Sequence, residues 1–183
     1  MLSALAGAQP APLQGVPLVD HRQQPLDARA LGGRPTLLHL VFTTCSTTCP
    51  TQVAELALVH RGLPEDVRRR LRVVSMSVDP LNDTPATLAA FARRLEADRP
   101  GWHFATGDLA AVHRVLDRLQ ALDPRRSPAR PEDHRTALFL YDAAGTLRLR
   151  LGGVPVDRAR LADELTQLAR LSVPAPTAAK TAP

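Results

Sequence analysis

The sequence predicts an α/β sandwich, in which a sheet is covered by helices. Short apolar runs of strand length alternate with segments whose apolar residues recur at helical spacing. The clearest buried strand is 71–79 (LRVVSMSVD), which is β-branched and largely apolar, as expected for a strand covered on both faces. Two strands around the turn 142–145 and a last helix complete the pattern. With 183 residues, of which 44% are hydrophobic, the chain suits one domain with a sizeable core.

The elements follow from the periodicity and from the turn residues. Thr84 is expected to cap a helix that has Pro85 at its first position. Strands are expected at Val16–Asp20 and Pro25–Leu26 (an N-terminal hairpin), Thr36–Phe42, Leu71–Asp79, Trp102–Ala105, Thr136–Tyr141 and Thr146–Leu151. Helices are expected from about Pro50 to Arg61, Pro85 to Asp98, Asp108 to Leu119 and Asp157 to Leu171.

The composition of the two chain ends sets the predicted boundaries of the folded domain. Residues 1–14 are rich in Ala, Pro and Gln and are predicted to be a flexible linker. Residues 15–172 form the predicted domain, with an exposed Pro- and charge-rich loop at 122–133. Residues 173–183 have too little hydrophobicity to fold and are predicted to be a disordered tail.

The stretch 37–50 (LLHLVFTTCSTTCP) carries the chemistry. A buried strand delivers the only two cysteines, Cys45 and Cys49, to the start of a helix. Free backbone N–H groups and the positive end of the helix dipole favour a thiolate there. If the first turn is helical, residues four apart have Cβ atoms roughly 5–6 Å apart. This separation suits either a disulfide or a shared soft metal ion, and spacing alone does not choose between them.

The charge pattern argues against nucleic acid as a partner. The net charge of +5 is nearly all arginine, since Lys180 is the only lysine. Aromatic residues make up only 3% of the chain, and none lies beside the basic cluster. That cluster is predicted to be the solvated last turn of a helix, where cations suit the dipole, and it consists of Arg68, Arg69, Arg70 and Arg72.

The first residues of the chain bear on whether the protein is exported or anchored to a membrane. No stretch approaches the roughly 20 apolar residues of a membrane span. Ala6-Gly7-Ala8 resembles a cleavage site, although the opening is too short for a signal peptide. We expect a trimmed or misassigned start, with an anchor missing from this sequence.

Three motifs occur in an order that resembles the Sco/SenC family. They are FTTCSTTCP after a buried strand, SVDPLNDTP about thirty residues on, and DHRTALFLYD opening a late strand. Members of this family are thioredoxin-fold copper proteins associated with assembly of the binuclear copper centre of cytochrome c oxidase. The similarity covers about 16–171 and implies a thioredoxin-like fold, with a central mixed sheet flanked by helices and extended by the N-terminal hairpin.

The resemblance also implies a set of site residues. Cys45 and Cys49 match the two thiolate ligands of the family, and His134 matches its histidine ligand. Asp79 and Asp83 match the acidic positions of the DPxxDT motif. Two thiolates and an imidazole suit copper, with Cu(I) drawn to sulfur and Cu(II) accommodated by the added nitrogen. A structural zinc site would prefer four protein ligands.

Each of these residues also has a purely structural interpretation. The two cysteines could be small buried hydrophobes, and His134 could be a solvated loop histidine. Asp79 could end its strand, and Asp83 could assist the Thr84 cap. The remaining histidines show no paired spacing and are interpreted as structural, with His60 and His113 on helix surfaces: His21, His39, His60, His103 and His113.

The leading hypothesis is a copper metallochaperone rather than an enzyme. The alternative is a thiol:disulfide oxidoreductase that reduces the cysteines of a partner so that copper can enter. The CxxxC spacing, and the absence of a proline in His134-Arg135-Thr136, argue against a general thioredoxin. A peroxidase would need a dedicated environment for its cysteine, and Thr43 or Thr44 with an unidentified arginine matches this too loosely.

Partners and location follow from the resemblance. The expected partner is the copper-bearing subunit of cytochrome c oxidase or another copper chaperone, and the protein is expected to be a monomer. It is expected to face the periplasm or cell envelope, with any membrane contact through an N-terminal anchor. Family members often carry a proline and an acidic residue inside the cysteine motif, where this chain has Ser46, Thr47 and Thr48. Loss of that negative charge should make the thiolates easier to form.

Overall fold

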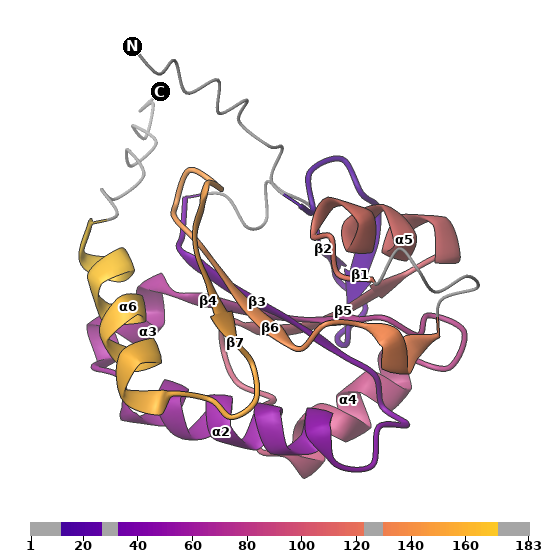
Figure 1. Ribbon diagram of the computed structural model, residues 1–183, viewed down its shortest axis with the longest axis horizontal. Coiled ribbons are helices and arrows are strands. Elements are labelled where there is room, and N and C mark those ends of the chain that lie inside the picture. The colour runs from indigo at the N-terminus through magenta and orange to yellow at the C-terminus, as the bar shows by residue number, and fades with distance from the viewer. Residues whose placement is uncertain (1–11, 27–32, 123–129, 172–183) are drawn as a thin grey trace, which may run out of the picture.

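The computed structural model describes residues 12–26, 33–122 and 130–171, which form one mixed sheet covered by helices (Figure 1). The strands are β1 (Leu18–Asp20), β2 (Pro25–Leu26), β3 (Thr36–Val41), β4 (Arg72–Ser77), β5 (Trp102–Gly107), β6 (Ala137–Tyr141) and β7 (Leu147–Gly152). The helices are α2 (Thr48–Gly62), α3 (Glu65–Arg70), α4 (Pro85–Arg94), α5 (Leu109–Arg118) and α6 (Arg158–Leu171), together with a 3-10 helix, η1 (Pro131–Asp133). The predicted α/β class is confirmed.

Three parallel strands form the centre of the sheet. The strand order is β2-β1-β5-β4-β3-β6-β7, in which β3, β4 and β5 run parallel. The hairpins β1–β2 and β6–β7 are antiparallel, as predicted, and they extend the two sides. Val41 pairs with Ser77, and the N–H of Val78 donates to the carbonyl of Val41 at 2.9 Å. The loops that follow β3 and β4 therefore leave the same edge of the sheet, and both cysteines belong to the first of these loops and the helix after it.

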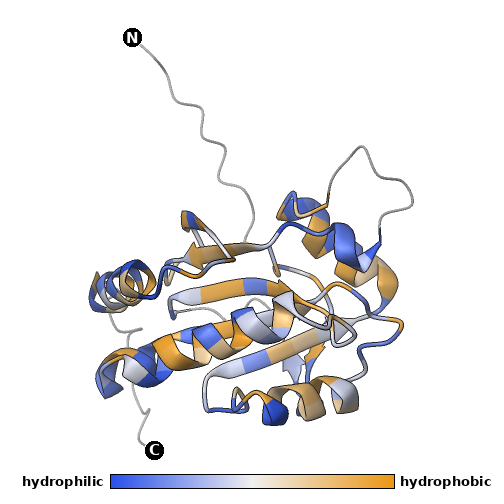
Figure 2. Cartoon of the chain, turned by 60° about the horizontal axis from the view of Figure 1, so that its bottom comes forward, coloured by the Kyte–Doolittle hydropathy of each residue, from blue (hydrophilic) through white to orange (hydrophobic). Residues whose placement is uncertain are grey.

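The sheet is buried on both faces, which explains why its central strands are so apolar. All six residues of β3 are buried. Leu37 and Val73 face the core formed with α2, α4 and α6, whereas Leu38 and Val74 face the core formed with α5. The central strands are largely apolar in Figure 2, whereas the helices combine polar and apolar residues along their length. The alternation of β-strand side chains thus divides the apolar residues between two cores.

Several boundaries differ from the expectations. The helix after the cysteine motif begins at Thr48 rather than Pro50, so Cys49 is helical. The helix after Thr84 ends at Arg94 rather than Asp98, since Glu96 adopts a positive φ of 53° that a helix does not allow. A helix ending in the basic cluster was expected without a stated start, and it is the short helix α3, Glu65–Arg70.

The predicted basic cluster is divided by a helix end. Arg68, Arg69 and Arg70 form the last turn of α3, as expected, and the first of these is partly buried. Arg72 lies in β4 instead, and its Nε is buried. The prediction that Arg72 is a solvated helix residue is therefore wrong.

Part of the predicted linker is packed against the domain. Leu13 is only 2% exposed, and Arg118 of α5 donates to the carbonyls of Pro12 and Gln14. The predictions for residues 1–11, 123–129 and 173–183 lie outside the described residues. Within the described ranges, no helix has both the length and the apolar character needed to cross a membrane.

A chain of buried polar groups crosses the core. The indole N–H of Trp102 donates to Oγ of Ser75 at 2.9 Å, and this Oγ lies 2.7 Å from Nε2 of His39. Nδ1 of His39 lies 3.0 Å from Oε1 of Gln52, whose amide donates to the carbonyl of Gly153. Burial lowers the pKa of His39 to about 4, so its ring is neutral at pH 7. The structural interpretation of His39 is confirmed.

His60 contradicts the prediction that it lies on a helix surface. It is only 7% exposed and packs against Trp102 with ring centroids 5.7 Å apart. The last turn of α2 therefore places the imidazole against Trp102 at the start of β5.

We predict that Ser75→Ala destabilises the protein by about 1–3 kcal/mol for each buried group it leaves unpaired, the Trp102 indole and His39 Nε2. Urea unfolding followed by tryptophan fluorescence measures the change. Ser46→Ala is the matched control, because Ser46 is exposed, and its free energy of unfolding should change by less than about 0.5 kcal/mol. Equal stability of Ser75→Ala and wild type would contradict the importance of this polar chain.

Candidate functional site

The loop between β3 and α2 places one cysteine sulfur at the start of a helix. The Cys45 N–H donates to the carbonyl of Phe42 at 3.2 Å, which closes a turn after the strand. Thr47 is the N-cap residue of α2, but its side chain makes no capping hydrogen bond. Instead, the Cys49 N–H donates to Sγ of Cys45 at 3.3 Å. The sulfur therefore takes the position that a capping oxygen occupies in an ordinary helix.

The two thiols have different acidities. Burial alone would raise the pKa of the Cys45 thiol, but hydrogen bonds from Cys49 and from the N–H groups of Thr47 and Thr48 outweigh it, so the pKa is lowered. Burial is the main cause that raises the pKa of Cys49 to about 12, and the charges of Cys45 and Asp83 add to it. Both cysteines are free thiols. The structure thus holds one accessible, acidic thiol next to one buried, protonated thiol.

Asp83 fastens the cysteine loop to the neighbouring strand. Its fully buried carboxylate accepts hydrogen bonds from the N–H and hydroxyl of Thr43 and from the hydroxyl of Ser77, at 3.1, 2.5 and 2.6 Å. Burial raises the pKa of Asp83 in spite of these bonds. Asp83 therefore positions the loop and does more than assist the cap at Thr84, whose own side chain accepts from the Thr87 N–H as predicted.

Asp79 organises the loop that contains Asp83. The Asp83 N–H donates to the carbonyl of Asp79 at 2.8 Å, and the carboxylate of Asp79 accepts from the side chain of Asn82 at 2.8 Å. The Asp79 N–H in turn donates to Oγ of Ser77. Asp79 thus follows its strand in a hydrogen-bonded turn that holds the backbone of Asp83, the acidic residue that contacts the cysteine loop.

His134 presents an unpaired nitrogen close to the same loop. Its Nδ1 lies 2.5 Å from the carbonyl of Pro131, and its ring meets Phe42 edge-on with centroids 5.6 Å apart. Burial lowers the pKa of His134, so the ring is neutral at pH 7. Because a carbonyl can only accept, Nδ1 carries the proton and Nε2 keeps a free lone pair. Nε2 is buried and has no hydrogen-bond partner.

The described residues contain no group of three or more His, Cys, Asp and Glu side chains close enough to hold a metal ion. The structure brings Cys45 and Cys49 together and places His134 on Phe42, just before their loop. Joining the third donor to the pair requires the two segments to move closer. The donors themselves fit copper, because two sulfurs and an imidazole with a free Nε2 form a soft set.

Sequence reasoning did not assign three residues that support this site. Phe42 packs edge-on against His134, and Thr43 and Ser77 bind the buried carboxylate of Asp83. For Thr43 and Ser77, the available sequence signal was that each is a polar residue at the end of a buried strand. Thr43 and Asp83 are 40 residues apart in sequence, and their contact depends on the pairing of β3 with β4.

The fold and the cysteine pair define a class, that of thioredoxin-like proteins with thiols at a helix start. The SCO1/SenC family model matches residues 14–170. The chain therefore belongs to the SCO1/SenC family. Its thioredoxin-like fold, inferred above from resemblance, is confirmed by structural neighbours in this family.

Three solved structures are similar over most of the chain. Copper-bound ScoI of Bradyrhizobium japonicum is 23% identical with a TM-score of 0.69, covering 84% of this chain and 96% of that one. A SCO1/SenC family lipoprotein of Bacillus anthracis is 23% identical with a TM-score of 0.72, covering 84% and 92%. BsSco, described as a cytochrome c oxidase assembly protein with a disulfide switch, is 21% identical with a TM-score of 0.71, covering 87% and 94%. At these identities the likeness shows the fold alone.

Similarity to curated relatives is higher but covers less of the chain. The SCO1 protein homolog of Bacillus subtilis is 35% identical over 78 residues, which is 43% of this chain and 40% of the relative. A Stutzerimonas stutzeri protein is 34% identical over 98 residues, covering 54% and 47%. The matched part spans less than half the length of each relative.

We predict that Cys45 is alkylated by iodoacetamide more than about tenfold faster than Cys49 at pH 7.5, because the lower pKa and greater exposure of Cys45 favour attack. The Cys45 rate should also reach half its maximum at a lower pH than an ordinary cysteine. Peptide mass spectrometry measures the modification at each site. In the Cys45→Ser control, only slow reaction at Cys49 should remain, and equal rates in the wild type would contradict the asymmetry.

Proposed function

We propose that this chain binds copper through Cys45, Cys49 and His134 and delivers it during assembly of the binuclear copper centre of cytochrome c oxidase. The observation that carries the proposal is the pair of thiols at the start of α2, with the unpaired Nε2 of His134 beside their loop. Family membership and the copper-bound ScoI structure support copper as the cargo.

The two cysteines have different tasks in capture. Cys45 provides the first thiolate, because the helix start stabilises its charge. Cys49, with a pKa of about 12, is protonated at pH 7 and must lose its proton when it binds the metal. Copper binding should therefore release a proton and strengthen as the pH rises. The buried position of Cys49 keeps that thiol from competing reactions until metal arrives.

His134 would allow the site to bind Cu(II) as well as Cu(I). Two sulfurs suffice for Cu(I), whereas Cu(II) favours an added nitrogen donor. The bond between Nδ1 and the Pro131 carbonyl orients the ring and leaves Nε2 as the donor atom. Asp79 and Asp83 do not bind the metal in this proposal but support the ligands. Asp83 holds the cysteine loop through its hydrogen bonds with Thr43.

The second candidate is a thiol:disulfide oxidoreductase acting on a partner's cysteines, and the asymmetry of the two thiols favours it. The Cys45 thiolate would attack the disulfide of a partner and form a mixed disulfide. Cys49, after losing its proton, would attack the Cys45 sulfur and release the partner as a dithiol, leaving a Cys45–Cys49 disulfide. The disulfide switch described for BsSco supports the ability of this fold to carry such a pair.

The partner and the location belong to the same proposal. The copper-bearing subunit of cytochrome c oxidase or another copper chaperone is the acceptor, and the protein acts as a monomer facing the periplasm or envelope. The similarity to a SCO1/SenC lipoprotein supports envelope association. Tethering would occur through the region before residue 15.

We predict that the reduced protein binds one copper per chain, and that Cys45→Ser or Cys49→Ser abolishes tight binding because one thiolate cannot form the sulfur chelate. His134→Ala should weaken Cu(II) binding more than about 100-fold, since even the loss of groups that only orient ligands costs 10–100-fold, and should affect Cu(I) less. Anaerobic titration and the thiolate-to-copper absorption band measure both.

His113→Ala is the matched control, because His113 is exposed on α5 and should leave both affinities unchanged. Full copper stoichiometry in either cysteine variant would overturn the copper assignment. If His134→Ala leaves the Cu(II) spectrum intact and oxidase copper loading normal while the cysteine variants fail, the oxidoreductase hypothesis is the better one.

A further inference from the structure

A cavity of about 610 Å³ lies at the opposite end of the parallel strands from the cysteines. It is bounded by the end of α2, by α3 and by the residues that precede β3, β4 and β5. The helix α2 connects the two places, with Cys49 in its first turn and His60 in its last. Eleven residues of helix separate them by roughly 16 Å. The cavity is therefore separate from the proposed copper site.

The lining of this cavity is strongly basic. Its walls are formed by Arg34, His60, Arg61, Glu65, Arg68, Arg69, Leu71, Arg99, Pro100 and Gly101. Five arginines thus face one carboxylate. Glu96, which does not line the cavity, pairs with Arg61 at 3.0 Å and with Arg99 at 3.9 Å. Counting both glutamates, the positive charges still exceed the negative ones by three.

The arginines differ in how far they are already engaged. Arg68 donates to the carbonyls of Arg61 and Leu63, which holds its guanidinium in place without neutralising it. Arg69 pairs with Glu65 at 3.3 Å on an exposed surface, where such pairs are weak. No described residue forms an ion pair with Arg34. Among the described residues, Arg34 and Arg68 therefore have no carboxylate partner, and Arg68 is held in place by its hydrogen bonds.

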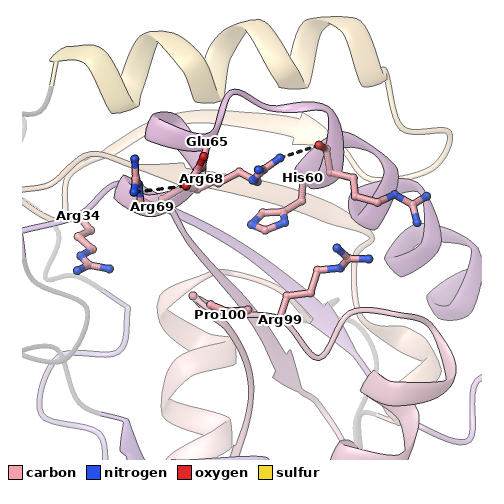
Figure 3. A pocket seen from close by; sticks show the side chains of 10 residues that line it. Arg34, His60, Glu65, Arg68, Arg69, Arg99 and Pro100 are labelled. Carbon is pink, nitrogen blue, oxygen red and sulfur yellow. Dashed lines mark hydrogen bonds and ion pairs between the residues drawn. The ribbon is translucent and has the colours of Figure 1, made fainter.

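A buried histidine also borders this space. Nδ1 of His60 is buried and has no hydrogen-bond partner, although the residue is only 7% exposed. Figure 3 shows its ring directed into the space surrounded by Arg34, Arg68 and Arg99. A buried polar group without a partner is costly, and this ring lies beside the arginines that would hold a bound anion.

We propose that this cavity is a binding site for a phosphate-bearing anion. Guanidinium groups match phosphate oxygens with paired, charge-assisted hydrogen bonds. A multivalent anion fits an excess of three positive charges better than a single carboxylate does. The cavity size lies within the ~300–1,000 Å³ range of small-ligand sites. The phosphate group could belong to a soluble molecule or to a lipid headgroup.

His60 provides a local reporter of binding. Burial, and after it the charges of Arg99 and Arg68, lower its pKa to about 4. Arg34, Arg61, Arg69 and Glu65 are the other charged groups that line the same cavity. A bound anion offsets the arginine charges, so the pKa of His60 should rise when the site is filled.

The test is titration of the full chain with inorganic pyrophosphate, followed by calorimetry and by NMR of the histidine rings. The expected result is saturable binding of one pyrophosphate per chain with a shift of the His60 signals. Arg34→Glu and Arg69→Glu should each weaken binding by roughly tenfold or more. Arg114→Glu is the matched control, because Arg114 is an exposed arginine on α5, and it should change the affinity less than twofold.

A second arm distinguishes the sources of the phosphate group. If the source is a lipid headgroup, the protein should bind phosphatidylglycerol vesicles but not phosphatidylcholine vesicles, and pyrophosphate should displace it. If the source is soluble, only pyrophosphate should bind. The absence of saturable binding in both arms, equal weakening by Arg114→Glu, or binding of an acidic peptide without pyrophosphate would overturn the proposal. None of these outcomes depends on copper binding.

Discussion

The hydrogen bond from the Cys49 N–H to the Cys45 sulfur sets the chemistry of the site. It depends on a helix that begins at Thr48, six residues after Phe42, so that an N–H of the first turn, which has no partner within the helix, points at the sulfur. The same geometry buries Cys49 and raises its pKa to about 12. One short segment of backbone thus produces an acidic thiol and a protonated one side by side.

Buried polar contacts keep this segment in place. Asp83 reaches from the loop after β4 to Thr43, so the cysteine loop is attached to the neighbouring strand through a carboxylate that accepts three hydrogen bonds. Gln52, one turn into α2, links the helix to His39 in β3 and to the carbonyl of Gly153. Because such groups are costly when unpaired, these contacts fix the position of α2 on the sheet.

The sequence predicted the elements whose signals are local. The β-branched runs indicated the central strands, and the apolar run before the two cysteines and the helical periodicity after Pro50 placed them at a helix start. The N-cap at Thr84 was also predicted, because it depends on residues three apart. The burial of His60 could not be predicted in this way, since the helix face it occupies is decided by packing against Trp102. The last turn of α3 was predicted from its arginines, but its start was not, because six residues with one buried apolar side chain carry little periodicity.

The central claim is that Cys45, Cys49 and His134 bind one copper ion together. In the described part of the chain, no three such side chains lie close enough to hold a metal ion. X-ray absorption spectroscopy of the Cu(II)-loaded protein tests this most directly, because it counts the donor atoms around the metal. The account predicts two sulfur donors and one imidazole nitrogen from the protein, with the imidazole signal lost in His134→Ala. Fewer than two sulfur donors in the wild type, or an unchanged imidazole signal in His134→Ala, would contradict it.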